Sequence, residues 1–242
     1  MVTSRPNDYN VVLLSLESDT GMDDDERLLI FAKFPEKGMV KTRLGRLTGE
    51  ETAVNLYRCF VKDAIALSQK AGYRPSIFFH PPEAREAMIE WLGRELAYER
   101  QEGDSLGERM YAAFRRVFQD CRRAVLIGTD TPDLPPALVE EAFRSLKTRD
   151  AVIGPACDGG YYLIGLSSDS LLPDLFHGLP WGSAFVFELT RRIFEGHGLK
   201  FSLLPRWRDI DEYDDLAALV DRWKDLPRGV LATIDYLRDH RW

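Results

Sequence analysis

Basic side chains gather directly after the first strongly apolar run of the sequence, residues 28–34. Lys33, Lys41 and Arg43 stand there, and Gly38 lies between them, where it frees the backbone. A guanidinium grips phosphate through two parallel hydrogen bonds, and an ammonium adds a mobile point charge. If the segment is extended, Lys41 and Arg43 point to one side. The pattern predicts a phosphate-binding loop made of Lys33, Gly38, Lys41, Thr42 and Arg43.

This loop differs from a P-loop. A P-loop requires Gly-x-x-x-x-Gly-Lys-Ser/Thr, because its glycines let backbone N–H groups wrap a phosphate. Here Val40 precedes Lys41, and no glycine stands five residues before it. A P-loop kinase or NTPase is therefore disfavoured. A solvated surface loop whose charges bind nothing is the alternative interpretation.

Carboxylates follow two later apolar runs. Asp130 comes after residues 124–128, and Pro132 ends that strand, so the carboxylate lies at the strand tip. Asp209 and Asp211 alternate along an extended stretch and therefore face the same way. Magnesium binds one or two carboxylates together with water and phosphate oxygens. The residues predict a Mg²⁺ or Mn²⁺ site at Asp130 with Asp209 or Asp211; a turn or helix-capping role is the alternative for these two.

A third polar motif follows residues 151–155. Asp158, Gly159, Gly160 and Tyr161 offer a carboxylate, two flexible N–H donors and an aromatic platform. These groups suit a sugar or phosphate head group, so they are predicted to bind an acceptor. A tight turn between two strands is the alternative.

Two further segments carry polar groups with two readings each. Residues 181–183, Trp-Gly-Ser, fit an acceptor lid or a helix cap. Residues 101–110 contain Gln101, Asp104 and Arg109, and fit a capped, solvated helix or a ligand contact.

Apolar periodicity predicts the elements that position these residues. Strands are expected over residues 28–34, 74–80, 96–100, 124–128, 151–155, 161–166 and 201–204, and helices over 48–72, 82–93, 104–119, 136–146, 183–195, 213–224 and 228–239. This alternation predicts an α/β fold with three layers, α/β/α, around a mostly parallel mixed sheet. Ligands of such sheets bind beyond the carboxyl ends of the strands, where the cations and carboxylates would meet. Together they suit a magnesium-bound polyphosphate.

Composition limits the possible partners and compartments. The 242 residues, 45% of them hydrophobic, suffice for one domain over residues 28–242, with residues 1–27 as an extension or linker that could add a strand at 11–16. A net charge of -7 argues against nucleic acid as a partner. Three cysteines without C-x-x-C spacing predict a reducing, cytoplasmic setting. No apolar run approaches the roughly 18 residues of a membrane span.

Four ordered motifs between about residues 28 and 220 resemble the nucleotide-diphospho-sugar transferase superfamily. They are F-A-K-x-P-x-x-G-x-V-K-T-R-L, G-T-D-x-P-x-L, G-P-A-x-D-G-G-Y-Y-L-I-G-L and D-I-D-x-x-x-D-L. Within the superfamily, the chain resembles the radical-SAM/selenodomain-associated glycosyltransferase branch. Its K-T-R-L element is also similar to the A-K-S/T-R-L of 2-phospholactate guanylyltransferases, and the chain looks related to molybdenum-cofactor guanylyltransferases.

The resemblance implies the GT-A fold and a metal-dependent transferase that takes a nucleotide or nucleotide sugar. Lys41, Arg43 and Asp130 would be catalytic, and Asp130 and Asp211 would hold the metal. Glycosyl transfer is the first interpretation, and nucleotidyl transfer with release of pyrophosphate is the second. A non-catalytic nucleotide-binding protein is the third. The chain departs from the nucleotidyltransferases because it lacks their Gly-x-x-x-Arg-x-Gly loop, and it has no Asp-x-Asp at Asp130.

Overall fold

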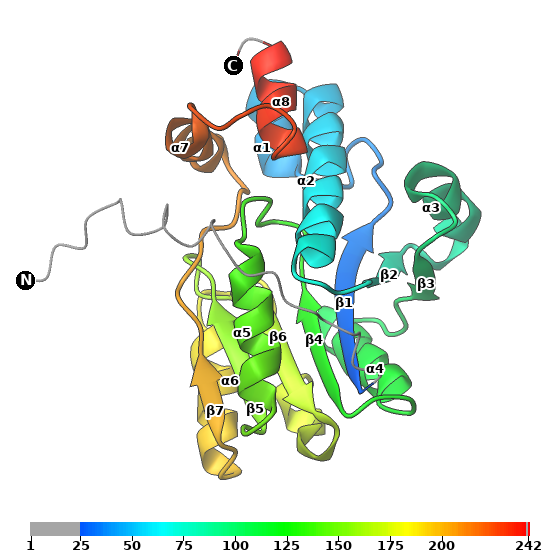
Figure 1. The fold of residues 1–242 in the computed structure, drawn as a ribbon, viewed down its shortest axis with the longest axis vertical. Helices are drawn as coiled ribbons and strands as arrows, with labels where there is room; N and C mark the ends of the chain where they lie inside the picture. Colours follow the sequence, from blue (N-terminus) through cyan, green and yellow to red (C-terminus); the bar gives the residue numbers. More distant parts are fainter. Residues whose placement is uncertain (1–24, 241) are drawn as a thin grey trace, which may run out of the picture.

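The computed structural model describes residues 25–240 and 242. They form three layers, a seven-stranded sheet with a layer of helices on each face (Figure 1). Among these residues the strand order is β3-β2-β1-β4-β6-β5-β7. β6 runs antiparallel to both neighbours, and the other pairs are parallel. The strands are β1 (Glu26–Lys33), β2 (Ser76–His80), β3 (Ala97–Arg100), β4 (Arg123–Ile127), β5 (Ala151–Pro155), β6 (Tyr161–Ser167) and β7 (Phe201–Leu203). The predicted α/β fold with a mostly parallel mixed sheet is confirmed.

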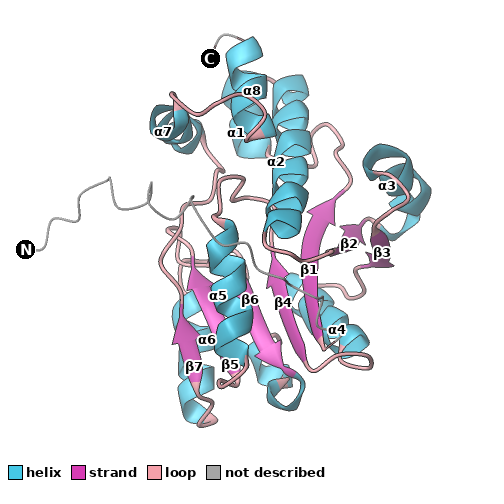
Figure 2. Ribbon diagram, in the orientation of Figure 1, coloured by secondary structure: helices cyan, strands magenta, loops and turns pink. Residues whose placement is uncertain are grey.

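Helices cover both faces of this sheet (Figure 2). Side chains of β1 alternate, so Leu28 and Ile30 pack toward α2 and α5, while Leu29 packs toward α4. Figure 1 shows α2 and α5 in front of the sheet and α4 and α6 behind it. The helices are α1 (Thr42–Thr48), α2 (Glu50–Lys70), α3 (Arg85–Leu92), α4 (Leu106–Val117), α5 (Pro136–Leu146), α6 (Val186–Gly196), α7 (Tyr213–Trp223) and α8 (Ala232–Asp239).

The first strand begins at Glu26, two residues before the expected domain boundary. The buried Glu26 carboxylate accepts hydrogen bonds from the Tyr73 hydroxyl, at 2.9 Å, and from Arg123 Nε, at 3.1 Å. These contacts fix the start of β1 from distant parts of the chain. The strand predicted at residues 11–16 lies outside the described residues.

The structure of the segment after β1 differs from the sequence prediction. Lys41 and Arg43 were expected to lie in an extended loop, but residues 42–48 form α1, because Leu44 is buried in a core shared with Phe60 and Ile210. The helix expected over residues 48–72 begins at Glu50 instead. Gly49, at φ 87°, separates α1 from α2, and no side chain caps α2.

Two helix starts also differ from the prediction. Ser105, rather than Asp104, caps α4, because its hydroxyl accepts the Glu108 N–H at 3.2 Å in a full capping box. α8 begins at Ala232 instead of residue 228. The Asp63 carboxylate of α2 accepts the Ala232 N–H at 2.7 Å, so a tertiary contact sets this boundary.

Besides the apolar cores on the two faces of the sheet, a third core lies between α1, α2, α7 and α8, which gather at the top of Figure 1. It includes Leu44 and Ile210, so the segments around residues 41 and 210 share one apolar base. No helix among the described residues is long and apolar enough to span a membrane.

A buried carboxylate ties the end of β4 to the last third of the chain. The Asp133 side chain is fully buried and accepts hydrogen bonds from Trp207 Nε1 at 3.0 Å, Arg222 at 2.6 Å and Trp223 Nε1 at 2.9 Å. These contacts hold the turn after β4 against Trp207 and against the last residues of α7 (Tyr213–Trp223).

Asp133→Ala is expected to lower the free energy of unfolding by about 3 kcal/mol, because it leaves buried donors and a cation without their partner. Urea denaturation measures the loss. The exposed Asp225→Ala is the matched control and is expected to change stability little. Equal stabilities of the two variants would contradict the assigned role of Asp133.

Candidate active site

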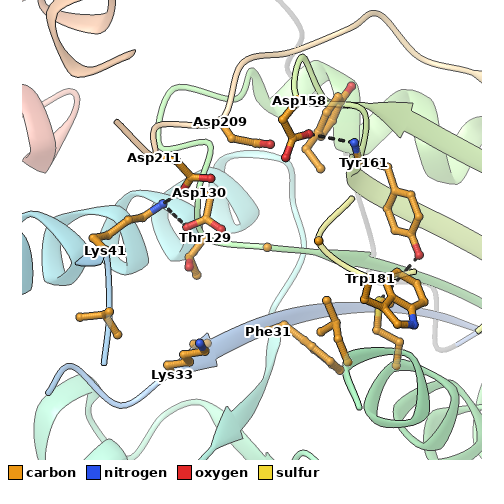
Figure 3. A pocket seen from close by; sticks show the side chains of 18 of the residues that line it. Phe31, Lys33, Lys41, Thr129, Asp130, Asp158, Tyr161, Trp181, Asp209 and Asp211 are labelled. Carbon is orange, nitrogen blue, oxygen red and sulfur yellow. Dashed lines mark hydrogen bonds and ion pairs between the residues drawn. The ribbon is translucent and has the colours of Figure 1, made fainter. Parts of the chain in front are cut away.

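A cleft of about 590 Å³ opens beyond the carboxyl ends of β1 and β4 (Figure 3). Segments far apart in the sequence line it, among them the end of β1 with the following loop, residues 128–130, Asp158 with residues 160–162, and Asp209 with Asp211. The cations and carboxylates singled out in the sequence therefore meet at one edge of the sheet.

Most of the predicted site residues line this cleft. They are Lys33, Lys41, Thr42, Arg43, Asp130, Asp158, Gly160, Tyr161 and Asp211, joined by Asp209. Gly38 and Gly159 are not among the lining residues. Gly38 lies in the loop at φ 74°, a conformation that glycine adopts readily. The chemical roles assigned to these residues stay predictions.

Lys41 is the centre of the charged end of the cleft. Its side chain is 4% exposed, and its ammonium pairs with Asp130 and, at 2.8 Å, with Asp211 Oδ1. The same ammonium donates to the Ile210 carbonyl at 2.8 Å and lies 5.2 Å from the centroid of the Phe60 ring. Figure 3 shows the ammonium between the two carboxylates.

The backbone of Lys41 is held in an unusual conformation. At φ 46° and ψ 43°, it lies in the left-handed region, alone among the non-glycine residues that the structure describes. Such a conformation costs free energy and persists where surrounding contacts outweigh it. Burial opposes the charge of Lys41, but the charges of Asp130 and Asp211 outweigh burial and raise its pKa. The lysine is therefore a fixed, charged group.

Arg43 does not share the direction of Lys41. The two residues were expected to point to one side of an extended segment, but Arg43 belongs to α1, where successive side chains turn by about 100°. Its side chain is 65% exposed and lies 3.6 Å from Glu212. Arg43 lines the cleft from its rim, whereas Lys41 lies at its floor.

The structure distinguishes between the two aspartates considered as second metal ligands. Asp130 and Asp211 both contact the one ammonium, so their carboxylates converge on a point that a cation occupies. Asp211 is not a helix cap, because Glu212 is the N-cap of α7. The residues fit a divalent ion bound by two carboxylates, with Lys41 as the competing cation. Among the described residues, no group of three metal-binding side chains forms a cage of protein ligands alone.

Asp209 lies beside this pair and is held in its protonated form at neutral pH. Burial raises its pKa to about 8, and the charges of Asp130, Asp158 and Asp211 add to the effect. The end of the cleft thus carries more carboxylates than Lys41 alone neutralises.

The motif at residues 158–161 forms a turn and also lines the cleft. Asp158 Oδ1 accepts the Gly160 N–H at 2.8 Å, as a turn residue does. Gly159 has φ 95°, and a Cβ there would collide with the backbone of Ala184. The turn reading is therefore confirmed for Asp158, whose role in binding an acceptor stays a prediction, and Gly159 is needed for the turn.

Tyr57 lines the cleft although the sequence did not single it out, and Gln101, which lies in a segment with two readings, lines it as well. The Tyr57 hydroxyl accepts the Lys33 N–H at 2.7 Å, and burial raises its pKa to about 12. Gln101 is buried, and its amide donates to the Phe78 carbonyl at 2.7 Å. Gln101 directly follows β3, as a ligand contact at a strand end would, and that role stays a prediction. Tyr57 lies within α2, where it looks like an ordinary core residue.

Comparison with solved structures identifies the family. A candidate nucleotide-diphospho-sugar transferase from Desulfovibrio desulfuricans G20 is 39% identical, with a TM-score of 0.86 over 90% of this chain and 96% of that one. This chain belongs to the same family. The chain also matches, over residues 64–183, the model of a family described as uncharacterized protein conserved in bacteria (DUF2064). No curated protein matches the chain.

More distant structures share the fold of this transferase family. The inositol-1-phosphate CTP transferase from T. maritima has a TM-score of 0.57 at 13% identity, over 85% of this chain and 98% of that one. A nucleotidyl transferase from Methanothermobacter has a TM-score of 0.55 at 16% identity, over 83% and 99%. These two likenesses show the fold alone.

Removal of the competing lysine is expected to strengthen metal binding. In Lys41→Met, Asp130 and Asp211 keep their charges but lose their ammonium, so the dissociation constant of Mn²⁺ should fall about tenfold or more. Isothermal titration without nucleotide measures it. Lys37→Met, which removes an exposed lysine paired with Glu51 outside the cleft, is the control. Unchanged or weaker Mn²⁺ binding by Lys41→Met would contradict the idea that the Lys41 ammonium and the metal ion compete for the same position between Asp130 and Asp211.

The protonated Asp209 predicts a pH dependence of stability. Its pKa is about 8 in the folded protein and near its ordinary value in the unfolded chain, so the folded state binds more protons between these values. The free energy of unfolding should therefore fall as the pH rises toward 8. Burial also raises the pKa of Asp63, to about 6, so this residue lowers the free energy of unfolding in the same way as the pH rises toward 6.

Urea denaturation of Asp209→Asn from pH 6 to 8 isolates the contribution of the Asp209 carboxyl to the pH dependence of stability. We expect a flatter profile than in the parent, because the variant has no proton to lose there. Asp225→Asn, at an exposed position, should keep the slope of the parent. If Asp209→Asn kept that slope as well, the assigned protonation would be wrong.

Proposed function

We propose that the protein is a metal-dependent transferase that acts on a nucleotide diphosphate sugar. The observation that carries the proposal is the convergence of Lys41, Asp130 and Asp211 at the carboxyl edge of the sheet, in a family that includes a candidate nucleotide-diphospho-sugar transferase. A diphosphate needs cations, and a bound Mg²⁺ or Mn²⁺ needs carboxylates, so both requirements are met at one point.

The charges of the cleft favour a divalent ion that arrives with the nucleotide. Asp130, Asp209 and Asp211 surround a single buried lysine, so a polyphosphate alone would meet excess negative charge even with Asp209 protonated. When bound to Asp130 and Asp211, the metal would neutralise diphosphate oxygens. Lys41, released from the carboxylates, would then pair with a phosphate, and Arg43 would contact it from the rim.

In glycosyl transfer, the bond between the anomeric carbon and the diphosphate oxygen breaks, and the nucleoside diphosphate leaves with the electron pair. The acceptor oxygen forms the new bond to that carbon. Its proton passes to a carboxylate of the cleft, and Asp158 is the candidate because it lines the proposed acceptor side. Lys41 and Arg43 stabilise the charge that develops on the leaving group.

Nucleotidyl transfer is the second candidate. The K-T-R-L element at residues 41–44 favours it, and nucleotidyl transferases share the fold. In that reaction an acceptor oxygen forms a bond to the α-phosphorus of a triphosphate, its proton passes to a carboxylate of the cleft, and the bond from the α-phosphorus to the bridging oxygen breaks as pyrophosphate leaves. The missing Gly-x-x-x-Arg-x-Gly loop places this reaction second.

Thermal unfolding with a panel of nucleotide sugars and nucleoside triphosphates, each with and without Mn²⁺, tests the proposal. A nucleotide sugar with Mn²⁺ should add roughly 2.7 kcal/mol at a hundred times its dissociation constant. The gain should vanish in Asp130→Asn, which is expected to keep its fold, and remain in Asp225→Asn. Stabilisation by a triphosphate alone would favour nucleotidyl transfer. No stabilisation by any nucleotide would contradict both transferase readings.

A further inference from the structure

The cleft has a second end whose chemistry differs from that of the lysine centre. Figure 3 shows Lys41, Asp130 and Asp211 at one side and Tyr161 and Trp181 at the other. Five apolar side chains of one cluster, Phe31, Met110, Leu126, Tyr161 and Trp181, line the cleft on the side of Tyr161, and Leu106 lies next to Gly107, which packs against Trp181. We call these six residues the apolar wall.

The polar atoms of the apolar wall are used within the protein. The Tyr161 hydroxyl is directed to Met110 Sδ, at 3.9 Å, and burial raises the pKa of this phenol. Trp181 Nε1 donates to the Phe176 carbonyl at 3.2 Å. A sugar ring would need hydrogen-bond partners for its hydroxyls, and leaving them unmet costs free energy. The apolar wall offers such partners poorly.

The apolar wall is also fixed in shape. Tyr161 and Trp181 meet edge to face, with ring centroids 6.2 Å apart. At the start of α4, Gly107 packs so closely that a Cβ would collide with Trp181 and with the Phe176 carbonyl. On the other side, the Phe187 N–H donates to the Gly159 carbonyl at 3.0 Å, which joins the 158–160 turn to α6. A preformed apolar surface of this kind suits a flat hydrocarbon or aromatic group.

We propose that the apolar wall binds the acceptor, and that the acceptor is an uncharged alcohol or phenol with an aromatic or hydrocarbon body. This inference rests on the proposed function and narrows its substrate class. The body lies on Tyr161, Trp181 and Leu106, and the hydroxyl points toward Asp158, which lies between the apolar wall and the lysine centre (Figure 3).

The test uses 2-naphthylmethanol as an apolar acceptor probe and methyl α-glucopyranoside as a polyol probe. Isothermal titration measures the binding of each to the full chain, with and without a saturating nucleoside diphosphate and Mn²⁺. The test variant is Leu106→Asn, which places an amide on the apolar wall. Its matched control is Leu47→Asn, at an exposed leucine of α1 outside the cleft. Melting temperature and nucleotide affinity report whether Leu106→Asn keeps its fold.

We expect the naphthyl alcohol to bind the parent and Leu47→Asn equally, and Leu106→Asn at least fivefold more weakly. Bound nucleotide should leave this binding in place. Tighter binding of the glucoside, an unchanged affinity in Leu106→Asn, or displacement of the probe by nucleotide would overturn the inference; displacement would make the apolar wall a nucleobase site. Failure of every nucleotide to bind would instead overturn the proposed function, whether or not the naphthyl alcohol binds.

Discussion

A buried lysine ammonium held by two carboxylates is the contact on which this site depends. Lys41 reaches Asp130 and Asp211 from a left-handed backbone conformation, and these partners come from parts of the chain far from it in sequence. A buried charge is costly unless it is paired and hydrogen-bonded, so each member of the group fixes the others. These three residues offer an ammonium to phosphates and two carboxylates to a metal ion, provided that the Lys41 ammonium moves away from the carboxylates.

The surrounding fold keeps these charges in register. Leu44, Phe60 and Ile210 belong to one apolar core beneath these charges. Leu44 follows Lys41 closely in the sequence and Ile210 directly precedes Asp211, so the core holds both charged residues in place. Asp133 joins the turn that carries Asp130 to the C-terminal segment through two indoles and a guanidinium. The parallel strands bring their carboxyl ends to one edge, and β6, antiparallel to its neighbours, starts at that edge with Tyr161.

The sequence predicts the layers, the strands and the charged residues of the cleft, because apolar periodicity and strand ends are local signals. Lys41, Asp130 and Asp211 are found this way, but their mutual contact is not, since it depends on how distant segments pack. α1 escapes prediction because the burial of Leu44 against Ile210 overrides the appearance of a charged loop. Tyr57 escapes because only its neighbour across the layers, the Lys33 N–H, distinguishes it from a core residue.

A double-mutant cycle on Lys41 and Asp211 tests the ion group most directly. It compares the free energies of unfolding of the parent, Lys41→Met, Asp211→Asn and the double variant, without metal or nucleotide. If the ammonium and the carboxylate are partners, the double variant should lose less stability than the sum of the single losses, with a coupling of about 1 to 3 kcal/mol. Losses that add within about 0.3 kcal/mol would show that the two groups do not depend on each other.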